Sequence, residues 1–300
     1  GAPLRVEVAA DGRNLASGIQ GFNQLIGPTP HVEVSGVVRG GHFTLESGVV
    51  EAAGLNAEMT GRIADSGAIT AAATGRLSRP VEINGTTFRR ATFEADITGT
   101  TEAPKIDALL TDADLAVAGL DLTNVGGDAT LQLGEGLSGA FTLSGDLLGQ
   151  RLNTQGRIAS DTGSVRIAGL SAELGQLRAE ATRLVFGDDG VIAEFTASGP
   201  LTGVGGIEAG TLTLNGSVNA GETITASVQG RAANLRRGTT RIEVVAFEGG
   251  IRNDVANLQA SVRGRLPAPL ELELGVTGRR NDADWMGEAT KARALEKLAK

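Results

Sequence analysis

The sequence predicts an all-β protein: a long, bent and mostly antiparallel sheet, with a short helix near residues 11–27 and a C-terminal helix. Apolar and polar residues alternate along most of the 300 residues, as in strands with one apolar and one polar face. Antiparallel sheets produce this alternation, whereas parallel strands covered on both faces read as continuous apolar runs. Turn-forming residues separate the alternating segments at hairpin spacing. These observations indicate many short strands with one apolar face each.

The apolar members of the alternating segments are the candidate lining of a groove. Residues 270–277 show the pattern most clearly, because three leucines and a valine alternate there with two glutamates, Gly275 and Thr277. The candidate groove residues are Leu55, Met59, Phe93, Ile97, Leu131, Leu133, Phe141, Leu143, Val191, Phe195, Leu212, Leu214, Ile224, Val228, Leu270, Leu272, Leu274 and Val276.

The 44 glycines are about twice the usual share, and we assign them to turns and to bends of a long sheet. Asn84-Gly85 and Asn215-Gly216 are dipeptides typical of type I′ hairpin turns. Residues 187–190 read as a hairpin loop, and glycine pairs at 126–127, 205–206 and 249–250 as further breaks. Polar-Gly-Arg steps are expected to close strands at residues 60–62, 74–76, 155–157, 229–231, 263–265 and 277–279.

Two segments have helical rather than strand spacing. Residues 11–27 place Leu15, Ile19, Phe22 and Ile26 on one face, and Gly27-Pro28 follows as a stop signal. Residues 283–299 repeat the pattern with Met286, Ala289, Ala292, Leu295 and Leu298. We therefore expect an elongated sheet over residues 1–280, with a helical insert at 11–27, and a helical segment over residues 281–300.

The composition excludes several classes of function. The chain has no Cys, two His and nine aromatic residues, and its net charge is −8. A thiolate zinc site, a cysteine nucleophile and a three-histidine metal site are therefore excluded. The few aromatic residues and the negative charge oppose nucleic-acid binding. No run of 18 apolar residues occurs that could span a bilayer.

No motif in the sequence indicates catalysis, a cofactor or a metal. Residues 134–139 match the dinucleotide fingerprint by letter, but a strand pattern follows where a helix would be needed. His31 and His42 are too sparse for a metal site and have no obvious carboxylate partner. Asp112 and Asp114 lie two apart on one strand face, and we expect them to be solvated rather than to act as an acid and a base. We predict that the protein is not an enzyme.

The alternating pattern by itself leaves two architectures open with equal weight. Two sheets could bury their apolar faces against each other as a closed sandwich. Alternatively, roughly twenty strands spaced about 4.8 Å apart form a sheet about 90–100 Å long, which folds into a trough lined by its apolar face. An exposed apolar patch of that size must be covered, and lipid acyl chains suit it because each buried methylene contributes about 0.8 kcal/mol.

A family resemblance favours the trough. An opening segment begins with Asp11-Gly12-Arg13-Asn14-Leu15-Ala16 and ends with Leu25-Ile26-Gly27-Pro28-Thr29-Pro30. It is followed by a strand at 32–36 that ends in Ser-Gly, and then by Phe43-Thr44-Leu45-Glu46. Together with Gly54-Leu55-Asn56-Ala57 leading to Gly61, and with alternating segments that end in glycine at 141–146 and 210–216, this resembles the TamB (translocation and assembly module) family and its AsmA-like relatives. The resemblance covers most of residues 1–280.

The resemblance implies a β-taco, a long bent sheet with a hydrophobic groove. Members of this family are anchored in the bacterial inner membrane, cross the periplasm, and are implicated in moving phospholipid to the outer membrane. TamB acts with the outer-membrane barrel TamA in protein assembly. By analogy, we expect a periplasmic fragment of a longer, inner-membrane-anchored protein, with phospholipid acyl chains as partners and a TamA-like barrel met through a region outside this chain.

Two alternatives remain beside the lipid conduit. A structural or adhesive β-solenoid, or a closed β-sandwich of an exported surface protein, would also be rich in strands, although the solenoid calls for a stricter repeat. The cargo of a groove could also be a nascent outer-membrane protein, because an open sheet edge can template a partner strand. The identity of the lipid and the direction of transport are not encoded in the pattern.

Overall fold

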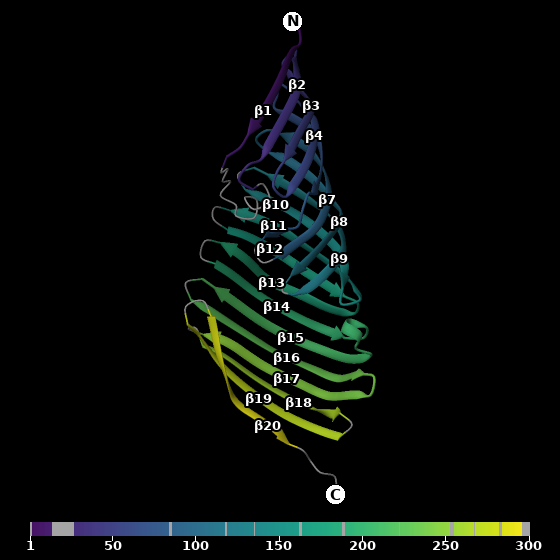
Figure 1. Cartoon of the computed structure of the whole chain (residues 1–300), viewed down its shortest axis with the longest axis vertical. Helices are drawn as coiled ribbons and strands as arrows, with labels where there is room; N and C mark the ends of the chain where they lie inside the picture. Colours follow the sequence, from purple (N-terminus) through teal and green to yellow (C-terminus); the bar gives the residue numbers. More distant parts are fainter. Residues whose placement is uncertain are drawn as a thin grey trace. The chain divides into compact units, whose positions relative to one another are not determined.

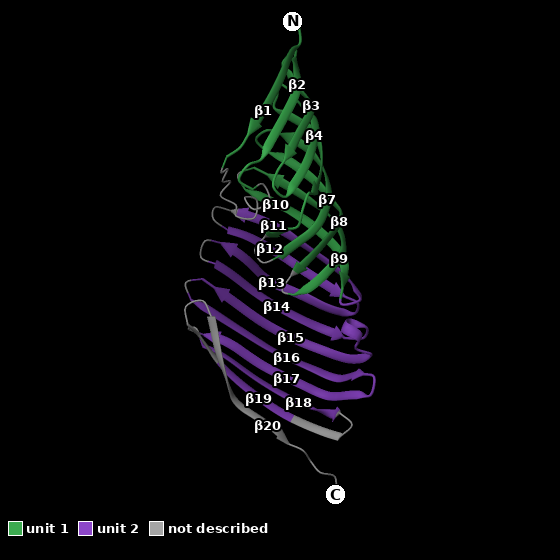
Figure 2. Cartoon of the chain, in the orientation of Figure 1, with its two compact units in different colours: residues 1–147 green, residues 148–300 purple. Residues whose placement is uncertain are grey.

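A computed structural model describes residues 2–13, 27–83, 86–117, 119–134, 136–161, 164–187, 190–221, 223–252, 255–266, 268–281 and 284–295. Of residues 83, 117, 161, 266, 268–271, 278–281 and 284–295 it describes the backbone alone. The predicted all-β, antiparallel fold is confirmed (Figure 1). Among the described residues the only helical element is a short 3₁₀ turn, η1, at Val204–Gly206. The chain divides into two compact units, residues 1–147 and 148–300 (Figure 2).

Unit 1 is an open antiparallel sheet in which neighbours in sequence are neighbours in space. Strands β1 to β5 pair consecutively, β5 pairs with β7, and β7 to β10 continue in order, while the short β6 pairs with the start of β7. The strands are β1 (Leu4–Asp11), β2 (His31–Arg39), β3 (His42–Glu51), β4 (Leu55–Ile63), β5 (Ala68–Leu77), β6 (Val81–Ile83), β7 (Thr86–Thr100), β8 (Pro104–Val117), β9 (Leu120–Leu133) and β10 (Leu137–Leu147).

Unit 2 repeats this plan, with consecutive antiparallel pairing from β11 to β20. Its strands are β11 (Gln150–Asp161), β12 (Ser164–Leu174), β13 (Leu177–Gly187), β14 (Gly190–Pro200), β15 (Ala209–Ala220), β16 (Ile224–Arg237), β17 (Thr240–Arg252), β18 (Val255–Leu266), β19 (Ala268–Asn281) and β20 (Asp284–Leu295).

Glycines in left-handed conformations make the tight turns between several strands. Gly149 and Gly238 have φ of 77° and 58°, and a Cβ added at either position would meet no atom within 4 Å. Glycine is therefore required at both positions by the left-handed backbone conformation and not by a lack of room for a side chain. The hairpin predicted around residues 187–190 is confirmed, because Gly187 at the end of β13 pairs with Gly190 at the start of β14.

The predicted C-terminal helix is wrong over its described part. Asp284–Leu295 form β20, which pairs antiparallel with β19 along its length. The register shifts by one residue between Gly275 and Val276. As a result Ala292 pairs with Leu274, while Ala289, three residues earlier, pairs with Val276 and faces the same side. The resulting spacing of three along β20 imitates helical periodicity. Most of the predicted helix at 11–27, residues 14–26, lies outside the described residues, and Asp11 belongs to β1.

Several glycine positions predicted as turns lie inside strands. Asn215-Gly216 sits in the middle of β15, and the glycine pairs at 126–127 and 249–250 lie within β9 and β17. The polar-Gly-Arg steps at 60–62, 74–76 and 263–265 end one residue before the ends of β4, β5 and β18, as predicted, whereas those at 155–157, 229–231 and 277–279 lie inside β11, β16 and β19. Asn84-Gly85 lies outside the described residues. The glycine pair at 205–206 is a true break, next to η1.

Candidate functional site

The strand register collects the apolar residues of each unit on one side of its sheet. Directly paired residues of antiparallel strands project to the same face, so that the pairings Met59↔Ala73, Ala71↔Ile97 and Ile97↔Ile106 trace one face across four strands of unit 1. Away from the strand ends, the residues on this side are Gly, Ala, Val, Ile, Leu, Met, Phe or Pro. We call this side the apolar face and the opposite side the polar face.

All eight candidate groove residues of unit 1 lie on its apolar face. Leu55 and Met59 come from β4, Phe93 and Ile97 from β7, and the pairs at 131/133 and 141/143 from β9 and β10. The chain of pairings that joins them passes through Gly75, opposite Phe93, and Leu131, opposite Ile106. The period-2 pattern therefore assigns the correct relative orientation to residues up to 88 positions apart in the sequence.

The ten candidates of unit 2 also share one side of its sheet. The pairings Ala197↔Leu214, Leu212↔Ala232 and Val262↔Leu272 connect β14 to β19 on this face. Leu270 is placed by backbone register alone, opposite Gly264. Sequence reasoning missed further residues of the apolar face: Leu184, Val218, Val245, Phe247, Ile251, Leu258 and Val262. In β13 and β17 register shifts or runs of adjacent apolar residues hide the alternation.

In-strand glycines on the apolar face are covered by phenylalanine rings of the neighbouring strand. A Cβ at Gly75 would lie 2.3 Å from Cζ of Phe93, and a Cβ at Gly230 would lie 2.4 Å from Cζ of Phe247. Phe195 covers Gly216 and Phe43 covers Gly36 in the same way. An aromatic ring over a strand glycine shields the bare backbone. The ring also lies along the sheet instead of standing up from it, which keeps the apolar face smooth.

The apolar face is only half buried within each unit. The buried hydrophobic residues among those described are few, and no large side chain is fully buried. The buried ones are Val81, Ala113, Val125, Ala197, Leu201, Val204 and Ala232. On the apolar face Met59 remains 37% exposed and Leu258 40% exposed. A closed sandwich would bury large apolar side chains at native packing density, and the described residues form no such core.

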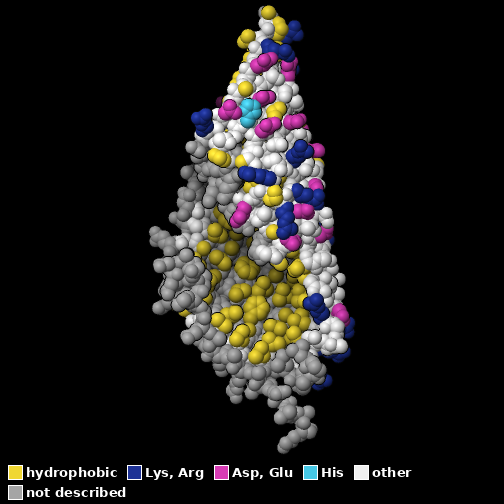
Figure 3. All heavy atoms as spheres, in the orientation of Figure 1, with side chains coloured by type: hydrophobic (Ala, Val, Ile, Leu, Met, Phe, Trp, Pro, Cys, Tyr) yellow, Lys and Arg dark blue, Asp and Glu magenta, His cyan; other side chains and the backbone are white. Residues whose placement is uncertain are grey.

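In unit 2 the apolar face is hollowed. A concavity of about 380 Å³ lies over β14 to β19, lined by Phe195, Val228, Ile251, Leu258, Val276 and small neighbours between them. Figure 3 shows apolar side chains gathered in a hollow at the level of these strands. Val228 has glycines as its partners on both neighbouring strands, Gly216 and Gly249. Two polar residues, Ser227 and Asn257, also line the hollow, but the register places their side chains on the polar face. The surface of the hollow is therefore mainly hydrocarbon.

The polar face of unit 1 carries ion pairs between neighbouring strands. Arg90 contacts Asp112 Oδ2 through Nη1 at 2.9 Å and Asp114 Oδ2 through Nε at 2.6 Å. The Arg90 guanidinium, with a backbone N–H donated by Asn124, holds the pKa of Asp114 below its usual value. A general acid at neutral pH needs a raised pKa. The two aspartates lie on one strand face, as predicted, but they pair with Arg90 rather than being simply solvated.

His31 has two carboxylate partners, which sequence reasoning missed. Its Nδ1 lies 2.8 Å from Asp11 Oδ1 and its Nε2 lies 3.1 Å from Glu33 Oε1. These hydrogen bonds, that of Asp11 first, raise the pKa of His31. Glu33 could have been found as the second residue along the same strand face, whereas Asp11 is brought in by the pairing of β1 with β2. The cluster joins the end of β1 to β2.

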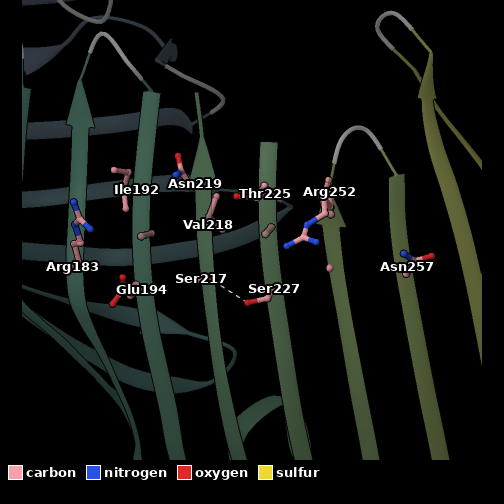
Figure 4. Close-up of a pocket in the computed structure, with 14 residues that line it drawn as sticks. Arg183, Ile192, Glu194, Ser217, Val218, Asn219, Thr225, Ser227, Arg252 and Asn257 are labelled. Atoms are coloured by element: carbon pink, nitrogen blue, oxygen red, sulfur yellow. Dashed lines mark hydrogen bonds between the residues drawn. The ribbon is translucent and has the colours of Figure 1, made fainter. Parts of the chain in front are cut away.

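The polar face of unit 2 holds a wide depression between β13 and β18 (Figure 4). Its volume is about 510 Å³, and its lining includes Arg183, Glu194, Asn219 and Arg252. Ser217 and Ser227 share a hydrogen bond of 2.9 Å across the β15–β16 pair. These side chains stand side by side on separate strands and do not converge on a single point, so the geometry assembles no nucleophile with a base.

The described residues contain no group of three or more His, Asp or Glu side chains placed to hold a metal ion. Within the described ranges, no helix is long and apolar enough to cross a membrane.

Comparisons with known proteins supply no family for this chain. No protein-family model, no curated protein and no solved structure matches it.

Proposed function

We propose that this chain is a segment of a hydrophobic conduit that carries phospholipid acyl chains along its apolar face, as the resemblance to the TamB and AsmA-like proteins suggests. In this proposal the sheet is bent as a β-taco, and the chain belongs to a longer periplasmic protein anchored in the inner membrane. The segment contributes surface for passage and no catalytic group. Assembly of outer-membrane proteins with a TamA-like barrel is the related activity.

One observation carries the proposal: each unit presents an apolar face across consecutive strands that its own described residues leave half exposed. A patch of this kind on a soluble surface is unfavourable unless another apolar material covers it. The hollow of unit 2 is lined by Phe, Val, Ile and Leu side chains. Acyl chains fit such a surface because their attraction to it is non-directional and grows with contact area.

The proposal explains why the apolar face lacks polar side chains and why its aromatic rings lie flat. A hydrogen bond would hold a lipid at one place, whereas contact at about 0.8 kcal/mol per methylene allows a chain to slide between equivalent positions. A charged headgroup gains nothing on a surface without polar partners and stays in water. The lipid therefore lies with its tails on the apolar face and its headgroup outside it.

Native mass spectrometry of the chain purified from a bacterial host tests this function. The expected result is a series of adducts with phospholipid masses, released by organic extraction and identified from the extract. A lipid-free protein that resists proteolysis would instead indicate a closed core or a solenoid. That outcome would overturn the conduit, because the apolar face would then be covered by protein.

A further inference from the structure

The ends of β16, β17 and β18 carry a row of arginines. Arg236 on β16 pairs directly with Arg241 on β17, and Arg241 pairs directly with Arg265 on β18. Directly paired residues project to the same face, so these three cations follow one another across the polar face of unit 2. Arg237, the last residue of β16, projects to the apolar side together with Leu235. Like charges directly opposite each other destabilise a sheet, so the row is unfavourable unless an anion lies against it.

The described part of the chain supplies an anion to only one of these four arginines. Glu208 Oε2 accepts a hydrogen bond from Arg236 Nε at 3.0 Å, and its other oxygen accepts one from a backbone N–H. Within the described residues the other three arginines, and Glu243 on the same stretch of β17, form no ion pair. We call the three arginines without an anionic partner the arginine rim: Arg237, Arg241 and Arg265.

We propose that the arginine rim binds the phosphate of an anionic phospholipid whose tails lie on the apolar face of the same strands. This inference rests on the proposed function and adds the class of lipid. A guanidinium presents a fork of N–H donors that matches a phosphate. Neighbouring strands are about 4.8 Å apart, so the arginines of β17 and β18 can share one phosphate. A headgroup with a net negative charge is favoured over one that also carries an ammonium, because the rim repels the ammonium.

The arginine rim stands where the apolar face ends. Leu235 pairs with Ile242 on the apolar face, and Ile242 is the residue next to Arg241. From Leu235 the apolar face continues along β16 through Ala232 to Val228 in the hollow, a path of roughly 23 Å. Figure 3 shows Lys and Arg side chains at the right-hand margin, beside the hollow. A lipid can therefore hold its phosphate at the rim while its tails lie along β16 toward the hollow.

The charge of the whole chain favours a lipid over a free anion. With a net charge of −8, most of the surface repels an anion, and the rim attracts it only locally. Tails that are held on the apolar face raise the effective concentration of the phosphate at the rim. We therefore expect inorganic phosphate to bind far more weakly than an anionic phospholipid.

Lipids with identical tails and different headgroups test the arginine rim. Displacement of a fluorescent fatty-acid analogue at low salt measures the affinities for phosphatidylglycerol and phosphatidylethanolamine. We expect the wild-type chain to bind phosphatidylglycerol about tenfold more tightly. Arg241→Gln combined with Arg265→Gln should remove this preference and leave the affinity for phosphatidylethanolamine nearly unchanged. The matched control, Arg183→Gln with Arg252→Gln, removes the same charge elsewhere on the polar face of unit 2 and should keep the preference.

The substitution Arg265→Glu separates binding from folding. It places a carboxylate opposite Arg241, so it replaces a like pair by an unlike pair and should preserve or raise the melting temperature. The affinity for phosphatidylglycerol should nevertheless fall at least about tenfold. A lower melting temperature would overturn the inference, because the arginine would then serve the fold.

The remaining outcomes distinguish the rim from the conduit. Equal affinities of the wild type for the two lipids, or the same loss of preference in the control, would overturn the rim and leave the proposed function intact. Inorganic phosphate that binds as tightly as phosphatidylglycerol would make the rim a site for free anions and would also overturn the inference. If neither lipid binds, the proposed function fails and the inference fails with it.

Discussion

The substitution Val228→Asp places a charge in the middle of the hollow on the apolar face of unit 2. Val228 lies on β16 between two glycines of the neighbouring strands, Gly216 and Gly249. No side chain at these positions can shield the new carboxylate from an acyl chain. Because Val228 is half-buried, its loss should cost the fold only about 1 kcal/mol, a fraction of the value for a fully buried valine.

The cost to a bound lipid is larger. A carboxylate keeps its water, so an acyl chain that crosses β16 loses contact over the width of one strand, about 4.8 Å. That width corresponds to about four methylenes, each contributing about 0.8 kcal/mol. The sum is about 3 kcal/mol, which lowers affinity by about two orders of magnitude.

Displacement of a fluorescent fatty-acid analogue from the purified chain measures this change. The matched control is Gln229→Asp, which introduces the same charge one residue along on the polar face. Circular dichroism must show that both variants remain folded. We expect the affinity to fall for Val228→Asp and to stay unchanged for Gln229→Asp. Equal affinities for the two folded variants would refute the assignment of the apolar face as the lipid surface.

Three further predictions test how the sheet is held together. Gly75→Val should destabilise the fold by about 1–3 kcal/mol through its clash with Phe93, measured by chemical denaturation, and Phe93→Ala in the same chain should relieve most of that loss. The pKa of His31 is raised, so the contribution of this side chain to stability is full below about pH 6.5 and is lost as the pH rises through the raised pKa. NMR titration should measure the raised pKa. The His31→Gln variant should lack this pH dependence of the melting temperature. The pKa of Asp114 is lowered from 3.8, chiefly by Arg90, so its contribution is present above pH 3.8 and lost below the lowered value; Asp114→Asn should therefore lower the melting temperature at pH 7 and match the wild type in strong acid.

Period-2 alternation predicts the face of a residue well because the side-chain period of a strand is two. Leu212 and Leu272 are 60 residues apart in the sequence, yet the register places them on the same side of unit 2. The same reasoning fails wherever a bulge changes parity. Between Ala289 and Ala292 the shift opposite Gly275 produces a spacing of three, which sequence reasoning took for a helix.

The role of the glycines was the larger error. Local propensity assigns glycine to turns, and Gly149 and Gly238 fulfil that expectation. Gly75, Gly216 and Gly230 instead lie inside strands, where a phenylalanine of the adjacent strand occupies the space of the missing side chain. This role depends on which residue the register places opposite each glycine. It is a tertiary property, and no window along the sequence contains it.

The polar-face contacts were missed for the same reason. Asp112 and Asp114 were correctly placed on one strand face, but their partner Arg90 comes from another strand, more than twenty residues away. His31 was read as having no carboxylate partner, although one of its two partners is Glu33 on its own strand. Strand spacing by itself could have identified the contact with Glu33, which lies two residues along the same strand, but not the contact with Asp11 on β1.

Site-specific photo-crosslinking in living bacteria tests the central claim most directly. A photoreactive amino acid is placed at Leu214 on the apolar face or at Asn215, the next residue, on the polar face. With radiolabelled phospholipid in the cells, we expect lipid adducts at position 214 and none at position 215. Equal labelling of the two positions, or no labelling at position 214 in a folded protein, would contradict a lipid-carrying apolar face.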